Sequence, residues 1–270
     1  MDTPIPPLGL GTYGRTGADG LAALEAALEL GFRHIDTAQS YGTEENVGEA
    51  IRRSGLPRRE VFVTTKIADT HLDSPRALES VDKSLSALGL DQVDLLLIHW
   101  PSYKDAVPME DYLGALAEAH SRGWARLIGV SNFTVANLRR TEEFLGSGAI
   151  STNQVEIHPY MQAPKLTAAM KEMGLTATAY QPLAKGRVAD DPVLAEIGAA
   201  HGITAAATSL AFLMNEGHAV IPASSNRARL AENLTARGVT LTPDEMTRIR
   251  ALHQGARIVN PDKSPDWDDR

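Results

Sequence analysis

Short apolar runs rich in Val, Ile and Leu recur along the chain, and longer segments with apolar residues at helical spacing separate them. Runs of this length, bounded by turn residues, are typical of buried strands, whereas the spacing between them indicates amphipathic helices. The pattern predicts strands at 8–12, 32–37, 61–66, 93–99, 125–131, 149–155, 175–180 and 218–223. It predicts helices at 20–30, 74–88, 109–123 and 164–173, more than one helix in 189–215, and a surface loop at 260–270.

Strand and helix alternate from one end of the chain to the other. This alternation favours a parallel sheet with helices outside it, and eight such strands favour a (β/α)8 TIM barrel. No segment rich in Pro, Gly or Ser divides the sequence, so we expect one domain over 1–270.

The segment Gly9–Gly14 reads G-x-G-x-x-G, the spelling of a Rossmann dinucleotide fingerprint, and Asp36 follows at a suitable distance. A Rossmann motif also needs a buried strand before it and a helix that begins within it. Here a proline-rich segment precedes the glycines, and the helical pattern begins only after Gly17. We therefore expect these glycines to allow a tight first strand at the edge of a pocket.

Composition excludes several classes of function. The net charge is -8 and basic residues are scattered, so the sequence predicts no nucleic-acid partner. With no cysteine, thiol nucleophiles and cysteine-ligated zinc are excluded, and the dispersed histidines predict no metal site. No signal peptide or membrane-spanning run is evident, so we expect a cytoplasmic protein that has no membrane partner and works as a monomer.

Polar residues stand where the predicted strands end, which is where TIM barrels carry their active sites. Each could have a structural role alone, as a helix cap, a solvated strand end or a buried core residue. Together they favour a site. The residues are Asp36, Tyr41, Lys66, His99, Ser131, Asn132, Asn153, Gln154 and Tyr180.

Four of these residue types make a defined chemistry together. A buried ammonium stabilises phenolate and so lowers the pKa of a nearby tyrosine, which is ordinarily close to 10. A carboxylate beside the lysine keeps it charged, and a neutral imidazole can polarise a carbonyl. Such a set protonates a carbonyl oxygen, and another group must supply the hydride.

At these residues the sequence resembles the aldo-keto reductase family over nearly its whole length. The matching segments include "GLGTY", "GFRHIDTAQSYGTEENVGEAI", "VFVTTKI", "VDLLLIHWP", "IGVSNF", "NQVEIHPY" and "IPASSNRARLAENL". It is most similar to bacterial members that reduce 2,5-diketo-D-gluconate and methylglyoxal. The resemblance implies a barrel that binds NADPH without a Rossmann motif and reduces aldehydes, α-keto aldehydes or keto-sugar acids. It also indicates that the family's N-terminal hairpin is reduced or absent here.

The resemblance also assigns roles to residues. Tyr41 would be the general acid, Lys66 would lower its pKa, Asp36 would pair with Lys66, and His99 would orient the substrate carbonyl. The substrate pocket would be shaped by Tyr13, Tyr41, His99, Trp100 and the tail around Trp267. The cofactor would be held by Gly11, Thr12, Asp36, Ser131, Asn132, Gln154, Tyr180, Gln181, Leu183, Ser224, Ser225, Arg229, Glu232 and Asn233.

One departure from the family pattern bears on the cofactor. Ala223 stands where a lysine is common, so one cation near a 2′-phosphate is missing and relaxed use of NADH is plausible. Ser225, Asn226 and Arg227 could substitute for that lysine, and Arg229 offers a planar cation for the phosphate.

Two other functions stay open. Lys66 could form a Schiff base in an aldolase, although a carboxylate partner argues against this by keeping it protonated. The barrel could also sense nicotinamide nucleotides without catalysis.

Overall fold

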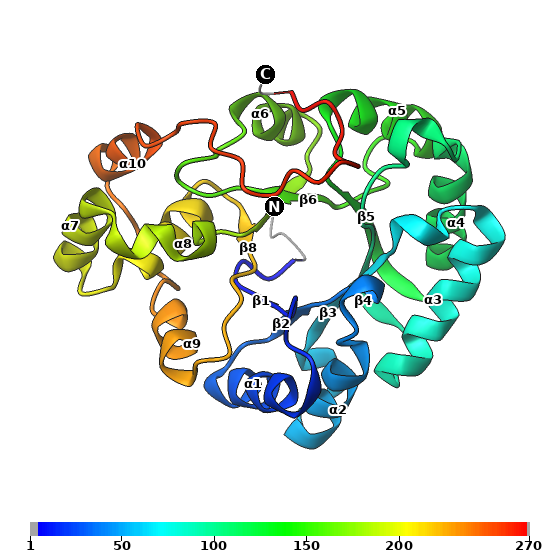
Figure 1. The fold of residues 1–270 in the computed structure, drawn as a ribbon, viewed down its shortest axis with the longest axis horizontal. Coiled ribbons are helices and arrows are strands. Elements are labelled where there is room, and N and C mark those ends of the chain that lie inside the picture. The colour runs from blue at the N-terminus through cyan, green and yellow to red at the C-terminus, as the bar shows by residue number, and fades with distance from the viewer. Residues whose placement is uncertain (1–4, 269–270) are drawn as a thin grey trace.

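Eight parallel strands, taken in chain order from β1 to β8, form the centre of the computed structural model, which describes residues 5–268. Hydrogen bonds also join the first strand to the last. The amides of Gly9 and Gly11 donate to the carbonyls of Val220 and Pro222 at 2.8 and 3.0 Å, and Leu8 pairs with Val220. These bonds close the predicted (β/α)8 barrel, and the helices surround it (Figure 1).

The strands are β1 (Leu10–Gly11), β2 (His34–Asp36), β3 (Phe62–Ile67), β4 (Val93–Ile98), β5 (Ala125–Ser131), β6 (Thr152–Glu156), β7 (Thr176–Tyr180) and β8 (Ala219–Val220). The helices are α1 (Gly17–Leu30), α2 (Glu44–Ser54), α3 (Ser74–Leu88), α4 (Met109–Ser121), α5 (Val135–Leu145), α6 (Pro164–Glu172), α7 (Pro192–His201), α8 (Ala205–Asn215), α9 (Arg227–Leu234) and α10 (Pro243–Arg250). Short 3-10 turns include η1 (Gln39–Tyr41), η3 (Asp69–His71) and η5 (Ala184–Asp190).

Two glycines of the G-x-G-x-x-G segment, Gly9 and Gly11, serve strand packing, as expected. A Cβ atom on Gly9 would lie 2.7 Å from Nδ1 of His34, and one on Gly11 would lie 3.0 Å from the carbonyl oxygen of Ile221. The first helix begins at Gly17, outside the segment. The chain therefore has no Rossmann motif here, and β1 is shorter than predicted.

Alternation along each strand sends one set of side chains into the barrel and the other toward the helices. Phe62 and Leu95 join Ile5 in a small apolar cluster, whereas Val63 and Leu96 belong to the large core that the helices cover. In the described part of the chain no strand precedes β1, and the buried side chain of Ile5 fills this end of the barrel.

Polar side chains follow the apolar cluster as the strands run toward their carboxyl ends. Nε2 of His34 and Oγ1 of Thr64 lie 3.0 Å apart, and the hydroxyls of Thr152 and Thr178 lie 2.8 Å apart. The same alternation places Lys66, four residues after Phe62, inside the barrel near the end of β3. The fold therefore gathers buried polar groups at one mouth of the barrel.

Within residues 5–268 no single helix is long and apolar enough to cross a membrane. Only α7 and α8 together would reach that length and apolarity, and they meet at an angle of 84°.

Candidate active site

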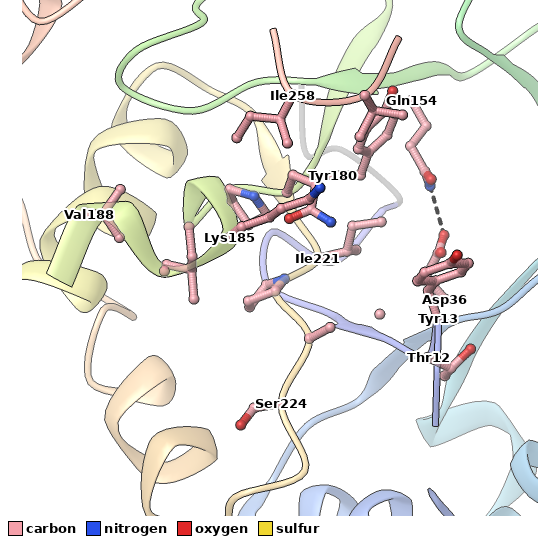
Figure 2. A pocket seen from close by; sticks show the side chains of 18 of the residues that line it. Thr12, Tyr13, Asp36, Gln154, Tyr180, Lys185, Val188, Ile221, Ser224 and Ile258 are labelled. Atoms are coloured by element: carbon pink, nitrogen blue, oxygen red, sulfur yellow. Dashed lines mark hydrogen bonds between the residues drawn. The ribbon is translucent and has the colours of Figure 1, made fainter. Parts of the chain in front are cut away.

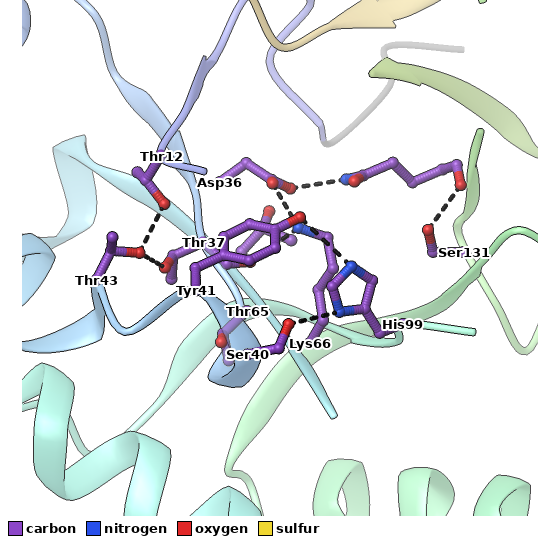
Figure 3. Close-up of polar contacts among 12 residues, drawn as sticks. Thr12, Asp36, Thr37, Ser40, Tyr41, Thr43, Thr65, Lys66, His99 and Ser131 are labelled. Atoms are coloured by element: carbon purple, nitrogen blue, oxygen red, sulfur yellow. Dashed lines mark hydrogen bonds and ion pairs between the residues drawn. The ribbon is translucent and has the colours of Figure 1, made fainter. Parts of the chain in front are cut away.

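Three neighbouring strands and one turn bring four of the predicted residues together. Asp36 is the last residue of β2, Lys66 lies one residue before the end of β3, and His99 follows β4 directly. Tyr41 closes the turn η1, five residues after Asp36. Figure 3 shows the hydroxyl of Tyr41 directed toward His99, with Lys66 beside the tyrosine, so the predicted residues do gather at this mouth.

Lys66 and Asp36 form a buried ion pair beneath the tyrosine. The ammonium donates to Oδ1 of Asp36 at 2.5 Å and to the carbonyl oxygen of Thr37 at 2.8 Å, and the two charged side chains are 0% and 2% exposed. Burial alone would lower the pKa of Lys66, but the charge of Asp36 and the neighbouring Tyr41 outweigh burial and raise this pKa. Lys66 therefore stays charged across the physiological range.

Tyr41 contacts both the cation and the imidazole. Its hydroxyl oxygen lies 3.4 Å from Nε2 of His99, and its ring centre lies 4.9 Å from the ammonium of Lys66. Burial raises the pKa of Tyr41 above its ordinary value, and the charge of Lys66 opposes this without reversing it. Lys66 thus acts on the pKa of Tyr41 in the expected direction, but in the protein alone burial outweighs the ammonium.

The imidazole of His99 is neutral near pH 7. Burial lowers its pKa well below the ordinary value, and the charges of Lys66 and Lys263 lower it further. Its Nδ1 lies 3.3 Å from the hydroxyl oxygen of Ser40. A neutral ring held between Ser40 and Tyr41 can donate a hydrogen bond to a carbonyl oxygen, depending on the tautomer.

A second group of predicted residues lies on β5, β6 and β7. Nδ2 of Asn132 donates to Oγ of Ser131 at 3.1 Å, Ser131 donates to the carbonyl oxygen of Gln154 at 2.8 Å, and the hydroxyl of Tyr180 donates to Oδ1 of Asn132 at 2.8 Å. Across the barrel, Nε2 of Gln154 donates to Oδ2 of Asp36 at 2.7 Å. The amide-bearing residues are therefore connected to the ion pair through one hydrogen bond.

These residues line a cavity of about 1110 Å³ at the mouth of the barrel. Figure 2 shows Asp36 and Gln154 on one side of it and Lys185 and Val188 on the opposite side. Lys66 is buried behind the wall and does not line it. The predicted residues in the lining are Gly11, Thr12, Tyr13, Asp36, Tyr41, His99, Trp100, Ser131, Asn132, Gln154, Tyr180, Gln181, Leu183, Ser224, Arg229, Glu232 and Asn233.

The loop after β8 supplies fewer groups to the cavity than expected. Ser225 is outside the lining, Asn226 accepts a hydrogen bond from the amide of Arg229 as the cap of α9, and Arg227 pairs with Glu29 at 2.7 Å. None of these three residues lines the cavity, and their role as substitutes for the lysine that Ala223 replaces stays a prediction. Arg229 is the cation that this loop and α9 contribute to the lining.

Sequence reasoning missed part of the lining. Local pattern gives no signal for Lys185 and Gly186, which enter the cavity because both take left-handed backbone angles inside η5. Residues 258–261 and Lys263 of the tail also line it, far along the chain from the strands. The resemblance assigned the tail around Trp267 to the substrate pocket but did not name these residues.

The tail at 260–268 forms no helix or strand and is partly exposed, as predicted for a surface loop, and contacts on either side of it hold it against the barrel. The carboxylate of the buried Glu156, at the end of β6, accepts the amides of Ile258 and Val259, both at 2.6 Å. Trp267 is only 6% exposed and packs edge-on against Trp100, with ring centres 6.2 Å apart. Trp267 therefore supports the pocket from behind Trp100 and does not line it; residues 269–270 lie outside the described residues.

Comparisons with known proteins agree with this geometry. The model of the aldo/keto reductase family matches residues 7–254. Methylglyoxal reductase DkgB of Escherichia coli O157:H7 is 42% identical over 265 residues, which cover 98% of this chain and 99% of the relative.

Solved structures give the same result. A crystal structure provisionally named 2,5-diketo-D-gluconic acid reductase B is 44% identical, with a TM-score of 0.93 and coverage of 98% of this chain and 94% of that one. The aldose reductase of Schistosoma japonicum is 29% identical, also with a TM-score of 0.93, covering 98% of this chain and 96% of that one. With a family match over most of its length and a site suited to carbonyl chemistry, the chain belongs to the aldo/keto reductase family and is an oxidoreductase acting on carbonyl groups.

Proposed function

We propose that this protein reduces aldehydes, α-keto aldehydes or keto-sugar acids to alcohols with NADPH, and that Tyr41 is the general acid. The observation that carries the proposal is the position of the Tyr41 hydroxyl, which lies in the cavity wall 3.4 Å from His99 and next to a buried charged lysine. A carbonyl oxygen placed between Tyr41 and His99 would contact two hydrogen-bond donors.

Each residue of the cluster then has a distinct role. Tyr41 donates its proton to the oxygen as negative charge develops there, and neutral His99 polarises the carbonyl. Lys66 stabilises the phenolate that Tyr41 leaves behind, although it does not reach the cavity itself. Asp36 holds Lys66 in place. Asp36 also accepts a hydrogen bond from Gln154, which links the position of Lys66 to the cavity wall formed by β5 and β6.

The residues on the other side of the cavity fit a dinucleotide. Ser131, Asn132 and Gln154 offer amide and hydroxyl groups for a carboxamide, and Arg229 offers a planar cation at the opposite end. Nδ2 of Asn233 is buried without a hydrogen-bond partner in a residue that lines the cavity, as expected for a donor awaiting a ligand. When bound, the nicotinamide cofactor supplies the hydride for the reduction.

The named relatives support the substrate classes. Proteins named methylglyoxal reductase and 2,5-diketo-D-gluconic acid reductase share 42% and 44% of their residues with this chain. The cavity exceeds the roughly 300–1,000 Å³ of a pocket for one drug-sized ligand, which supports binding of a cofactor and a small carbonyl compound together.

The two other functions are disfavoured by particular residues. A Schiff-base aldolase needs an accessible neutral amine, whereas Lys66 is fully buried and its raised pKa keeps it charged. A sensing barrel needs no general acid, yet Tyr41 and His99 both face the cavity.

A screen of purified protein against aldehydes, α-keto aldehydes and keto-sugar acids, following NADPH absorbance, tests the proposal. We expect carbonyl-dependent oxidation of NADPH with methylglyoxal among the substrates. NADPH binding without such oxidation for any compound would favour the sensing function. Since one chain brings Asp36, Lys66 and His99 together with Tyr41, we also propose that the monomer is active, which light scattering of the active fraction would test.

A further inference from the structure

Lys263 brings a positive charge to the end of the cavity where the carbonyl would react. It lines the same cavity as His99 and Trp100, and its ammonium lies 5.6 Å from the centre of the Trp100 ring. Its charge also contributes to the lowered pKa of His99, which shows that the two groups are close enough to interact. The tail therefore carries a cation to the site that strand-end residues form.

The present partner of Lys263 is readily exchanged. Its ammonium contacts Oδ1 of Asp69, in the turn η3 after β3, at 2.8 Å. The two side chains are 35% and 28% exposed, so the pair is hydrated and contributes little stability. A carboxylate arriving through the cavity can replace Asp69 without leaving a deeply buried charge unpaired.

The other cations of the cavity belong to different segments. Among the described residues that line it, the remaining cations are Lys185 of η5 and Arg229 of α9. Figure 2 shows Lys185 across the cavity from Asp36. The net charge of -8 repels an anionic substrate at long range, whereas the charge of Lys263 attracts it near His99.

We propose that Lys263 binds the carboxylate of an anionic carbonyl substrate, taking that carboxylate in exchange for Asp69 while Tyr41 and His99 hold the carbonyl oxygen. The protein would then prefer aldehyde acids and keto acids to neutral carbonyl compounds of the same size. This inference rests on the proposed function and adds the substrate class that the tail selects.

The test compares substrates that differ in charge. In Lys263→Met, we expect kcat/KM to fall roughly three- to tenfold for succinic semialdehyde and 2,5-diketo-D-gluconate, mainly through KM. The methyl ester of succinic semialdehyde and methylglyoxal, which are neutral, should keep their wild-type values. Asp69→Asn frees the ammonium and should lower KM for the two acids alone.

A matched control distinguishes two roles of Lys263, recognition of the substrate and support of the tail. Lys165 also holds the tail, donating to the carbonyl oxygen of Asp268 at 3.0 Å, but it does not line the cavity. Lys165→Met should therefore leave the ratio of acid to ester unchanged. If Lys263→Met lowers kcat/KM equally for acids and neutral compounds, Lys263 only clamps the tail and the inference is wrong. Wild-type protein that reduces no carbonyl compound at all would instead contradict the proposed function.

Discussion

The ammonium of Lys66 lies 4.9 Å from the ring centre of Tyr41, where it pairs with Asp36 and donates to the carbonyl oxygen of Thr37. The cation does not line the cavity, so it acts on a reacting carbonyl through its neighbours Tyr41 and His99. The contribution of the ion pair to the free energy of unfolding can therefore be measured separately from its effect on catalysis.

Replacing Lys66 with Met should destabilise the fold strongly. The change leaves the carboxylate of Asp36 buried without its cation, which costs about 3–5 kcal/mol in comparable buried pairs. Urea unfolding of the two proteins measures the difference in the free energy of unfolding. The double variant Lys66→Met with Asp36→Asn removes both charges and should recover a large part of the loss. A single variant as stable as wild type would show that this pair is not buried as described.

The rate of reduction should be insensitive to pH over a wide range. Because the pKa of His99 is lowered, the ring gains a proton only well below pH 6.5, and because the pKa of Tyr41 is raised, the phenol loses its proton only above pH 10. We therefore expect kcat/KM for methylglyoxal to stay level between about pH 6.5 and 10. An acid limb near pH 6.5 that disappears in His99→Gln would contradict the assignment of a neutral imidazole.

The loop after β8 should determine the preference between cofactors. Ala223→Lys adds a cation at the cavity wall, and an exposed charge pair of this kind contributes on the order of 1 kcal/mol, or several-fold in affinity for NADPH. NADH affinity should hardly change, and the gain should shrink as salt rises. Arg229→Ala should weaken NADPH more than NADH.

Fluorescence titration of both cofactors checks the cofactor prediction. Arg227→Ala is a suitable control, because Arg227 pairs with Glu29 and does not line the cavity. Equal shifts for NADPH and NADH in Ala223→Lys, or an unchanged ratio in Arg229→Ala, would mean that this segment does not read the 2′-phosphate.

The pattern of apolar residues along the sequence predicted the barrel. Both faces of the barrel strands are buried, and this burial produces apolar runs such as the one in β4. Helix α3 matches its predicted bounds, since Asp73 caps its start and Gly89 ends it. Strands β1 and β8 are shorter than predicted, because only two residues of each form regular ladders before the backbone turns toward the cavity.

The strand pattern predicted the part of the site that follows the strands, and the resemblance added cavity residues such as Arg229 and Asn233 of α9. Asp36, Lys66 and His99 were found because parallel strands end at one mouth, a rule that needs no knowledge of distant contacts. Lys185 depends on left-handed backbone angles, and Lys263 depends on the capture of the tail by Glu156 about a hundred residues earlier. The net pKa of Tyr41 also escaped prediction, because the degree of burial is a property of the whole fold.

The most direct test of the central claim is the turnover of Tyr41→Phe, measured together with its affinity for NADPH. The substitution removes one hydroxyl from a wall that other residues also form, so cofactor affinity should stay close to that of the wild type. If that hydroxyl donates the proton, kcat for methylglyoxal should fall roughly 10²–10⁴-fold. A variant that binds NADPH normally and turns over methylglyoxal at nearly the wild-type rate would contradict the claim that Tyr41 is the general acid.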